Sequence, residues 1–164
     1  MISTRRLSEL DRRAGQALRE IVNQRPEALR VAQVGSEAFA PTFRLAVAAA
    51  VMGRATRRQG VHALLSAGTA AGVARLARDA IGRPRPGSRR EGGFPSRHAA
   101  AGAAIATSAS KAPLGIGATL WVAMAIGSAC RVATGEHEVG DVVAGAALGV
   151  LVAASFDAVA GAPR

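Results

Sequence analysis

The first 30 residues differ in pattern from the rest of the chain. Between residues 7 and 22 the apolar side chains recur every three or four positions, and arginines together with Glu20 occupy other positions. This spacing predicts an amphipathic helix that ends before Pro26 and lies either against a soluble bundle or on a membrane surface. Its apolar face is formed by Leu7, Leu10, Ala14, Leu18, Ile21 and Val22.

Beyond Pro41 the chain consists mainly of apolar stretches separated by short basic or polar segments. The stretches cover residues 42–53, 59–77, 97–110, 112–130 and 138–158. Only 112–130 lacks charge over about the 20 residues that a perpendicular bilayer crossing needs. We predict an all-α protein, a multi-pass transmembrane helical bundle with an N-terminal amphipathic helix, while hydropathy alone leaves a soluble helical bundle open. We expect one domain over residues 1–164, with the amphipathic segment at 1–30 and a helical membrane core at 42–158.

Small residues favour close packing between the predicted helices. Gly145 and Gly149 form a small-xxx-small pair, and residues 99–104 are all alanine or glycine. Such surfaces let helices approach closely, which is how helices associate in lipid. Hydrophobic residues make up 49% of the chain and aromatic residues only 3%, a composition that suits helices better than a β-sandwich.

Basic residues outnumber acidic ones, with 21 Lys and Arg against 11 Asp and Glu. Such an excess is typical of proteins that bind nucleic acid, an anionic membrane surface or phosphorylated substrates. Aromatic residues are not interleaved with the arginines, as a single-strand binder would require, so we expect no nucleic-acid partner. A single cysteine, Cys130, excludes an internal disulfide and a cysteine-cluster metal site. Residues 1–30 show no continuous apolar core or cleavage site, so we expect no signal peptide.

Three polar clusters interrupt the apolar pattern near predicted helix ends, where charged groups are normally retained for function. They cover residues 78–86, 94–98 and 130–141. Their arginines can bind phosphate oxygens through two parallel hydrogen bonds and stay charged at any useful pH. Together with two histidines, these are the groups that a phosphoryl transfer without metal needs.

The second and third clusters also predict how some of these groups are oriented. A proline followed by Ser96 indicates a helix start, so the backbone N–H groups of Ser96, Arg97 and His98 could face an anion. His137 and Asp141 are four residues apart in a helical pattern and would share one face. The carboxylate would then fix the imidazole tautomer and stabilise the charge that the ring acquires.

The spacing of these clusters resembles the type 2 phosphatidic acid phosphatase (PAP2) family. The family pattern is a basic residue, six residues and Arg-Pro, then Pro-Ser-Gly-His, then Ser-Arg, five residues, His, three residues and Asp. The chain has these blocks in order and with these internal spacings, and in length it is similar to short bacterial membrane members. The matching residues are Arg78 with Arg85-Pro86, Pro95-Ser96-Arg97-His98, and Cys130-Arg131 with His137 and Asp141.

The resemblance implies a phosphatase that works through a phosphohistidine. His137 would be the nucleophile, Asp141 would orient it, and His98 would protonate the leaving alkoxide and later act as base for water. No metal and no organic cofactor is implied. The residues implied to hold the phosphoryl oxygens are Arg78, Arg85, Ser96, Arg131 and, through its backbone amide, Arg97.

Three residues depart from the family pattern. Arg78 stands where lysine is usual, which keeps the charge but not the geometry of a point donor. Arg97 replaces a glycine whose small size would allow close backbone approach to phosphate, and Cys130 replaces a serine hydroxyl. None of the three removes a nucleophile or an acid, so we expect activity.

The resemblance implies a substrate that is a phosphomonoester or diphosphate of a membrane lipid. Candidates are a polyprenyl phosphate or diphosphate, a polyprenyl phosphoribose phosphate and phosphatidic acid, and short bacterial members act on polyprenyl carriers in cell-envelope synthesis. The partners would be this lipid phosphate and the bilayer, and a homo-oligomer is left open. The alternative is a non-enzymatic basic membrane or nucleic-acid-binding protein that holds phosphates irrespective of sequence. The related vanadium haloperoxidases are much larger and soluble, which argues against them.

One histidine and three arginines outside the matching blocks are expected to have no catalytic role. A lone histidine on an apolar face is usually structural, so His62 is expected to be a core or interfacial residue. Arg83, Arg89 and Arg90 are expected to be solvated loop residues or contacts to anionic lipid.

The expected location is the cell membrane, crossed several times. The loops 78–97 and 131–138 must share one side for the motifs to meet, with 54–58 and Lys111 on the other side. The basic N-terminal segment would share the catalytic side, and the positive-inside tendency favours the cytoplasm for that side.

Overall fold

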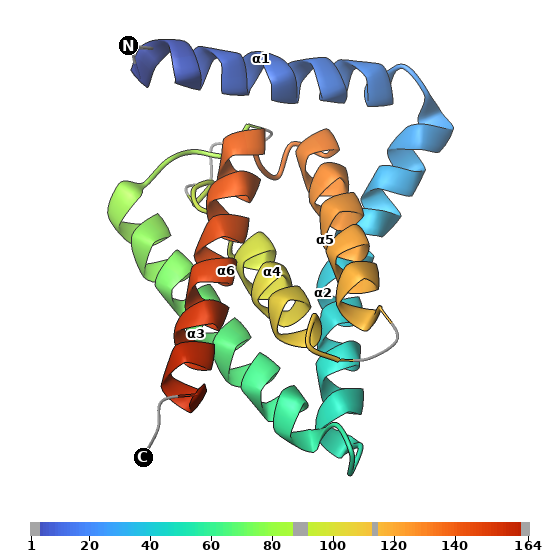
Figure 1. Cartoon of the computed structure of the whole chain (residues 1–164). Coiled ribbons are helices and arrows are strands. Elements are labelled where there is room, and N and C mark those ends of the chain that lie inside the picture. Colours follow the sequence, from blue (N-terminus) through green and yellow to red (C-terminus); the bar gives the residue numbers. More distant parts are fainter. Residues whose placement is uncertain (1–3, 87–91, 113–114, 162–164) are drawn as a thin grey trace.

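The structure is a computed structural model that describes residues 4–86, 92–112 and 115–161 (Figure 1). The helices and their bounds are α1 (Thr4–Asn23), α2 (Pro26–Met52), α3 (Arg57–Ile81), α4 (Arg97–Ala109), α5 (Ile116–Ala133) and α6 (Val139–Gly161). The elements in the described ranges are thus all helical, which confirms the predicted all-α class. Helices α2 to α6 form a bundle, and α1 lies across one end of it.

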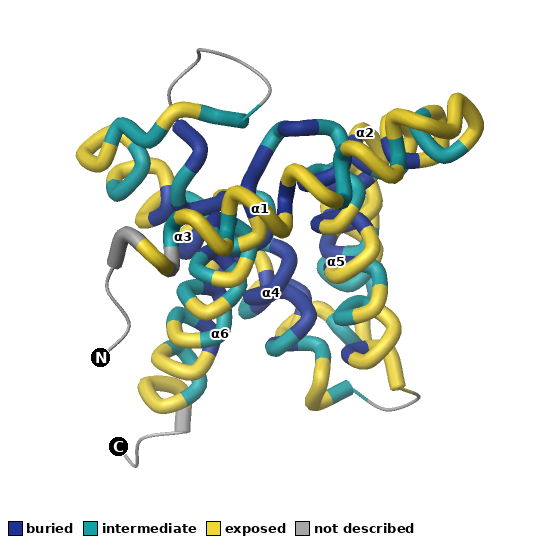
Figure 2. The backbone as a smooth tube through the Cα atoms, turned by 90° about the horizontal axis from the view of Figure 1, so that it is seen from above, coloured by how far each residue is buried: buried dark blue, intermediate teal, exposed yellow. Residues whose placement is uncertain are grey.

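Helix α4 forms the centre of the bundle and packs against α3, α5 and α6. Seen from the α1 end, the buried backbone is concentrated along α4 (Figure 2). Most of its buried residues are alanine, glycine or serine. Because these side chains are small, neighbouring helices can approach α4 from several directions.

Helix α6 packs against the backbone of α4 at two glycines. A Cβ atom at Gly145 would lie 2.3 Å from the carbonyl oxygen of Ser96, and one at Gly149 would lie 2.1 Å from that of Ala100. Real Cβ atoms do not come this close, so a larger residue at either position requires a shift of the helix. The predicted small-residue pair is therefore a helix contact, and it places the start of α6 beside the start of α4.

The chain turns between α1 and α2 at Pro26. Helix α1 ends at Asn23, as predicted, and Pro26 opens α2, where its missing N–H costs no hydrogen bond. Helix α2 then continues through Pro41, so it begins well before the apolar stretch that starts at residue 42. Phe39 and Phe43, on either side of Pro41 and four residues apart, are both buried in the core.

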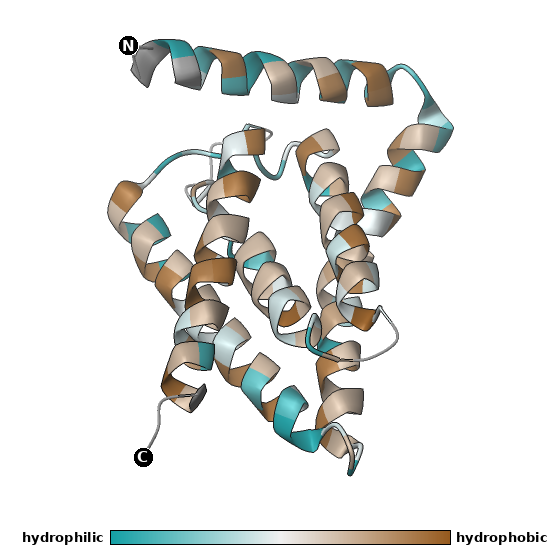
Figure 3. Ribbon diagram, in the orientation of Figure 1, coloured by the Kyte–Doolittle hydropathy of each residue, from teal (hydrophilic) through white to brown (hydrophobic). Residues whose placement is uncertain are grey.

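The outer surface of the bundle is largely apolar. Hydrophobic residues cover its middle, and hydrophilic residues gather toward the two ends (Figure 3). The segments Ile116–Ala133 and Val139–Ala160 are long and apolar enough to cross a membrane, with mean hydropathy of 1.5 and 2.1. Large outward side chains, including Leu45, Leu76 and Leu151, are more than half exposed. Such a surface suits contact with lipid rather than water.

The connections between helices gather at the two ends of the bundle. The α3–α4 and α5–α6 connections lie at the end that α1 covers, whereas the α2–α3 turn lies at the other end (Figure 1). The three polar clusters of the sequence therefore meet at one end, beneath α1.

Candidate active site

His137 lies between α5 and α6 and is 1% exposed. Its Nδ1 lies 2.9 Å from the carbonyl oxygen of Gly93. Since a carbonyl oxygen only accepts hydrogen bonds, Nδ1 carries the proton. In the neutral ring Nε2 then has a free lone pair, which accepts a hydrogen bond from the hydroxyl of Ser96, 3.1 Å away. The ring is thus held with the unprotonated lone pair on Nε2.

Asp141 lies in the first turn of α6 and is fully buried. Its Oδ2 is 3.5 Å from His137 Nδ1 and accepts a hydrogen bond from the N–H of Glu138 at 2.9 Å. Helix α6 begins at Val139, so His137 precedes it. The prediction that His137 shares a helical face with Asp141 was wrong. The two side chains are adjacent, but the acceptor for the Nδ1 proton is the carbonyl of Gly93, which no motif marks.

Arg83 connects the site to α1. Its Nη1 donates to Asp141 and its Nη2 donates to Asp11, each over 2.9 Å. Burial alone would lower the pKa of Arg83, but the hydrogen bond to Asp11 and the charges of Asp141 and Asp11 raise it. The prediction that Arg83 is solvated or contacts lipid was wrong, because two carboxylates hold it. Arg89 and Arg90, for which the same role was predicted, lie outside the described residues.

Ser96 caps α4, as the Pro-Ser sequence predicts. Its hydroxyl accepts a hydrogen bond from the N–H of Ala99 at 3.4 Å while it contacts His137. Its own N–H donates to the carbonyl oxygen of Asp141 at 2.9 Å. The predicted orientation of this N–H toward an anion was therefore wrong, whereas the hydroxyl lies beside the predicted nucleophile.

Three arginines of the predicted site have unused donors. Arg78 lies in the last turn of α3, Arg85 in the α3–α4 connection and Arg131 in the last turn of α5. Their Nε–H groups are buried and have no hydrogen-bond partner among the described residues. Arg97 and Arg85 are close enough to act electrostatically on both Arg78 and Arg131. We call the guanidinium groups of Arg78, Arg85, Arg97 and Arg131 the arginine cluster. Buried donors of this kind are costly unless an acceptor satisfies them.

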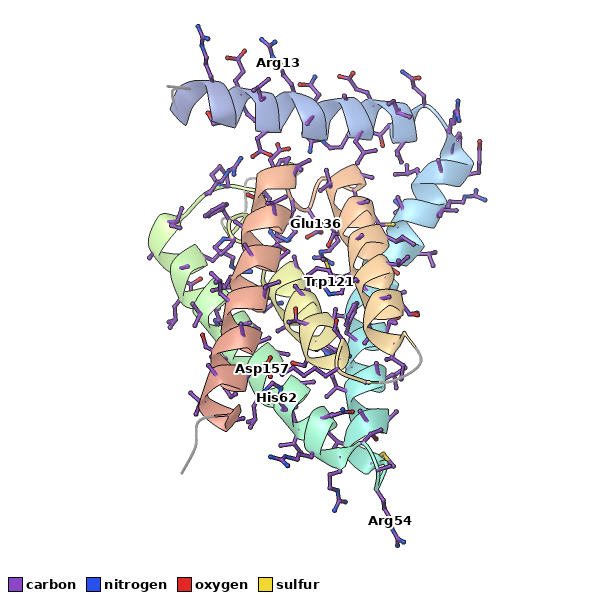
Figure 4. All side chains as sticks on the ribbon, in the orientation of Figure 1. Arg13, Arg54, His62, Trp121, Glu136 and Asp157 are labelled. Atoms are coloured by element: carbon purple, nitrogen blue, oxygen red, sulfur yellow. The ribbon has the colours of Figure 1, made fainter. Side chains whose placement is uncertain are left out.

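Glu136 brings a negative charge to the arginine cluster. Its carboxylate contacts Arg85 and lies 3.4 Å from Nη2 of Arg131. Figure 4 shows Glu136 near the end of the bundle that α1 covers. Arg131 also donates to the carbonyl oxygen of Ser36 in α2 at 3.3 Å. The motif does not predict Glu136, because it occupies an unspecified position, and the only available signal was an acidic side chain next to His137 in the sequence.

His98 lies in the first turn of α4 and lines a cavity of about 640 Å³ between α2, α3 and α4. It follows Arg97 in the chain, and the charges of Arg131 and Arg97 act on it. Its ring meets the ring of Phe39 edge-on, with centroids 6.2 Å apart. The cavity wall is mainly apolar, and it includes Phe43, Val47, Val51, Leu64, Ala101 and Ile105, together with the polar residues Arg44 and Arg97.

The structure shows how the three residues that depart from the family pattern are accommodated. Arg78 crosses Gly92, which has φ of +96° and where a Cβ atom would lie 2.8 Å from Arg78 Nε. Arg97 is the first residue of α4, so its backbone is helical, a conformation open to any side chain. Cys130 packs its sulfur against Gly35 of α2, where a Cβ atom would lie 2.6 Å away.

His62 lies at the opposite end of the bundle from Glu136 (Figure 4). Its Nε2 is 3.2 Å from a carboxylate oxygen of Asp157 in α6, and its ring meets that of Phe156 edge-on. His62 is therefore an interfacial residue between α3 and α6, in agreement with the prediction. In the described part of the chain, no group of three or more His, Cys, Asp and Glu side chains is placed to hold a metal ion.

A family comparison agrees with this arrangement. The family model of the PAP2 superfamily matches residues 59–160, which include all three polar clusters. The chain belongs to the PAP2 superfamily. The predicted resemblance is thereby confirmed. Among curated protein sequences, none matches this PAP2 chain significantly.

Two solved structures share the PAP2 fold with this chain. The transmembrane PAP2-type phosphatidylglycerolphosphate phosphatase of Bacillus subtilis aligns with a TM-score of 0.70 and 22% identity, over 91% of this chain and 85% of its own. Aquifex aeolicus LpxE aligns with a TM-score of 0.72 and 20% identity, over 86% of this chain and 92% of its own. The likeness extends beyond the family match into the helices before α3. Helices α5 and α6 are long and apolar enough to cross a membrane, and the Bacillus subtilis protein of the same fold is described as transmembrane.

Proposed function

We propose that this PAP2 protein is a lipid phosphate phosphatase that works through a phosphohistidine on His137. One observation carries the proposal: a histidine with Nε2 oriented for attack lies at the same end as three arginines whose buried Nε–H groups lack partners among the described residues. Phosphoryl oxygens match such a cluster in charge and in hydrogen-bonding geometry.

In the first half-reaction His137 Nε2 attacks phosphorus, and the bond between phosphorus and the leaving oxygen breaks. The electron pair of that bond stays on the leaving oxygen, which His98 protonates. The imidazole becomes positively charged. Its Nδ1–H donates a hydrogen bond to the carbonyl oxygen of Gly93, and the carboxylate of Asp141 lies 3.5 Å from Nδ1. The hydroxyl of Ser96, displaced from Nε2 by the new N–P bond, can then donate to a phosphoryl oxygen.

In the second half-reaction water attacks phosphorus while His98 takes a proton from it. The N–P bond breaks, its electron pair returns to His137 Nε2, and inorganic phosphate is released. The arginine cluster stabilises the negative charge on the phosphoryl oxygens in both transition states. These groups supply the positive charge that the reaction requires.

The cavity beside His98 supports a lipid substrate. Its apolar wall can hold the first part of a hydrocarbon chain whose remainder lies in the bilayer, while the phosphate lies at the arginine cluster. The Bacillus subtilis protein of the same fold is by name a phosphatidylglycerolphosphate phosphatase, which also has a phosphorylated lipid substrate. The proposed class comprises polyprenyl phosphates and diphosphates, polyprenyl phosphoribose phosphate and phosphatidic acid.

The test is release of inorganic phosphate from a panel of these lipids by the purified full chain in detergent, with EDTA present. Hydrolysis is expected in EDTA, and His137→Ala is expected to abolish it. Activity that depends on added metal, or that survives His137→Ala, would contradict this mechanism. Binding of the lipids without hydrolysis would identify a non-enzymatic membrane protein instead.

A further inference from the structure

Helix α1 contacts the catalytic end of the bundle through specific polar groups. The two carboxylate oxygens of Asp11 accept hydrogen bonds from the N–H of Gly140 at 2.6 Å and from Arg83 at 2.9 Å. Arg19 donates from both Nη atoms to the carboxylate of Glu138, each over 3.3 Å. A helix that only lies on a membrane surface needs no such contacts. Helix α1 therefore interacts specifically with the segment that follows His137.

Asp11 is connected to Asp141 by two routes. The first passes through Arg83, which donates to Asp11 from Nη2 and to Asp141 from Nη1. Because a guanidinium is planar and rigid, holding one of its Nη atoms orients the other. The second passes through Gly140, which precedes Asp141 and whose N–H is one of the donors that a helix start leaves free. Both routes fix the carboxylate that lies 3.5 Å from His137 Nδ1.

Helix α1 packs closely against Glu138 at Gly15. A Cβ atom there would lie 2.0 Å from Oε2 of Glu138, so α1 comes as close as a residue without a side chain allows. Glu138 is itself only 5% exposed and is held by Arg19. Asp11 lies one helical turn before Gly15 and on the same face, so its placement over Arg83 follows from this contact.

From these contacts we propose that Asp11 is a positioning residue for His137, acting through Arg83 and Asp141. The inference rests on the proposed function, because it assigns the effect of Asp11 to the phosphoryl-transfer step. Within the described residues Asp11 bonds to Arg83 and Gly140, and it is absent from the lining of the cavity. Loss of Asp11 should therefore lower kcat and leave KM nearly unchanged.

The experiment compares Asp11→Ala and Asp11→Asn with the unmodified chain and with Glu9→Gln, a control whose exposed carboxylate pairs with Arg13 on the outside of α1. Asp11→Ala should lower kcat roughly 10- to 100-fold, because a misplacement of about 1 Å can cost as much as 100-fold. Asp11→Asn keeps one acceptor oxygen and should restore part of the rate. Glu9→Gln should leave both kinetic constants unchanged.

Rapid-quench measurement of phosphohistidine formation, together with the inhibition constant of inorganic phosphate, separates positioning from a merely structural role. A slower phosphorylation step with unchanged phosphate inhibition supports the proposal, and Asp11→Asn carries the test if Asp11→Ala does not fold. An unchanged kcat, or equal losses in kcat and in phosphate affinity, overturns it. If His137→Ala remains active, the proposed function fails, whereas an inactive His137→Ala beside a normal Asp11→Ala rejects this inference alone.

Discussion

At the residue scale, the two histidines of the site differ in their surroundings and therefore in the roles that they can perform. His137 is 1% exposed and has a partner on each ring nitrogen. His98 is half-buried, lines the cavity and lies beside the arginine cluster. A nucleophile needs a fixed orientation, whereas a general acid needs access to the leaving group. Each environment suits the role proposed for its histidine.

Replacement of His98 by Ala tests this division of roles. An alkoxide leaving group needs a proton in the transition state, so His98→Ala should lower kcat/KM on alkyl phosphates by ~10²–10⁴-fold. The leaving group of an aryl phosphate needs little protonation, so the decrease in kcat/KM on that substrate should be small. The measurement is the ratio of kcat/KM for aryl and alkyl phosphates in the variant and the unmodified chain. Equal losses on both substrates would mean that another residue is the acid.

The carboxylate of Glu136 contacts two arginines that are proposed to hold phosphate, so the two anions compete. Glu136→Gln keeps the size of the side chain and removes its charge. Inorganic phosphate should then inhibit roughly 10- to 150-fold more strongly, because a charge-assisted hydrogen bond worth roughly 1.5–3 kcal/mol no longer has to be displaced. The inhibition constant is the measurement, with the exposed Glu20→Gln as control. Weaker inhibition would show that Glu136 holds the arginines in place for the substrate.

Motif spacing predicts residues of the site only where the family pattern specifies them. The matching blocks locate His137, Asp141 and Ser96, and the structure brings these three side chains and backbones into contact. Asp11 and Arg83, by contrast, are 72 positions apart. Their pairing depends on how α1 lies across the bundle, and no local spacing encodes that arrangement.

At the element scale, the contact between α6 and α4 can be tested with one substitution made at two glycines. Gly72 in α3 has open space at its Cβ position, so Gly72→Ala should raise stability by roughly 1 kcal/mol through helix propensity. At Gly149 the new Cβ would meet the carbonyl oxygen of Ala100 at 2.1 Å, and overpacking that costs roughly 1–3 kcal/mol should outweigh this gain. Thermal unfolding in detergent is the measurement. Equal stability of the two variants would contradict the close α4–α6 contact.

Apolar periodicity predicts the helices better than their ends. The stretches 97–110 and 138–158 correspond closely to α4 and α6. The stretch 42–53 covers only the second half of α2, because the side chains of α2 change from mixed to apolar near Pro41 while the backbone continues as a helix. The first half of α2 lies toward the end that α1 covers, outside the apolar middle of the bundle, and there its side chains are more polar (Figure 3).

At the scale of the whole molecule, the length of the bundle separates the end of the proposed site, where Glu136 lies, from the end where Arg54 projects outward (Figure 4). Helix α1 belongs to the catalytic end and carries exposed arginines, such as Arg12 and Arg13, that are outside the proposed site. Basic segments close to membrane helices tend to stay in the cytoplasm. The exposed arginines of α1 therefore predict that the end of the proposed site faces the cytoplasm.

Cysteine labelling of intact cells tests this orientation, in a background where Cys130 is replaced by Ser. Glu20 on α1 and Arg54 in the α2–α3 turn are both exposed, so a cysteine at either position can react once reagent reaches it. A membrane-impermeant maleimide should label Arg54→Cys on intact cells, and it should label Glu20→Cys only after permeabilisation. The opposite result would place the catalytic end at the outer face, where it would meet phosphorylated head groups of the outer leaflet. The arginines of that end would then be explained by anion binding rather than by the positive-inside tendency.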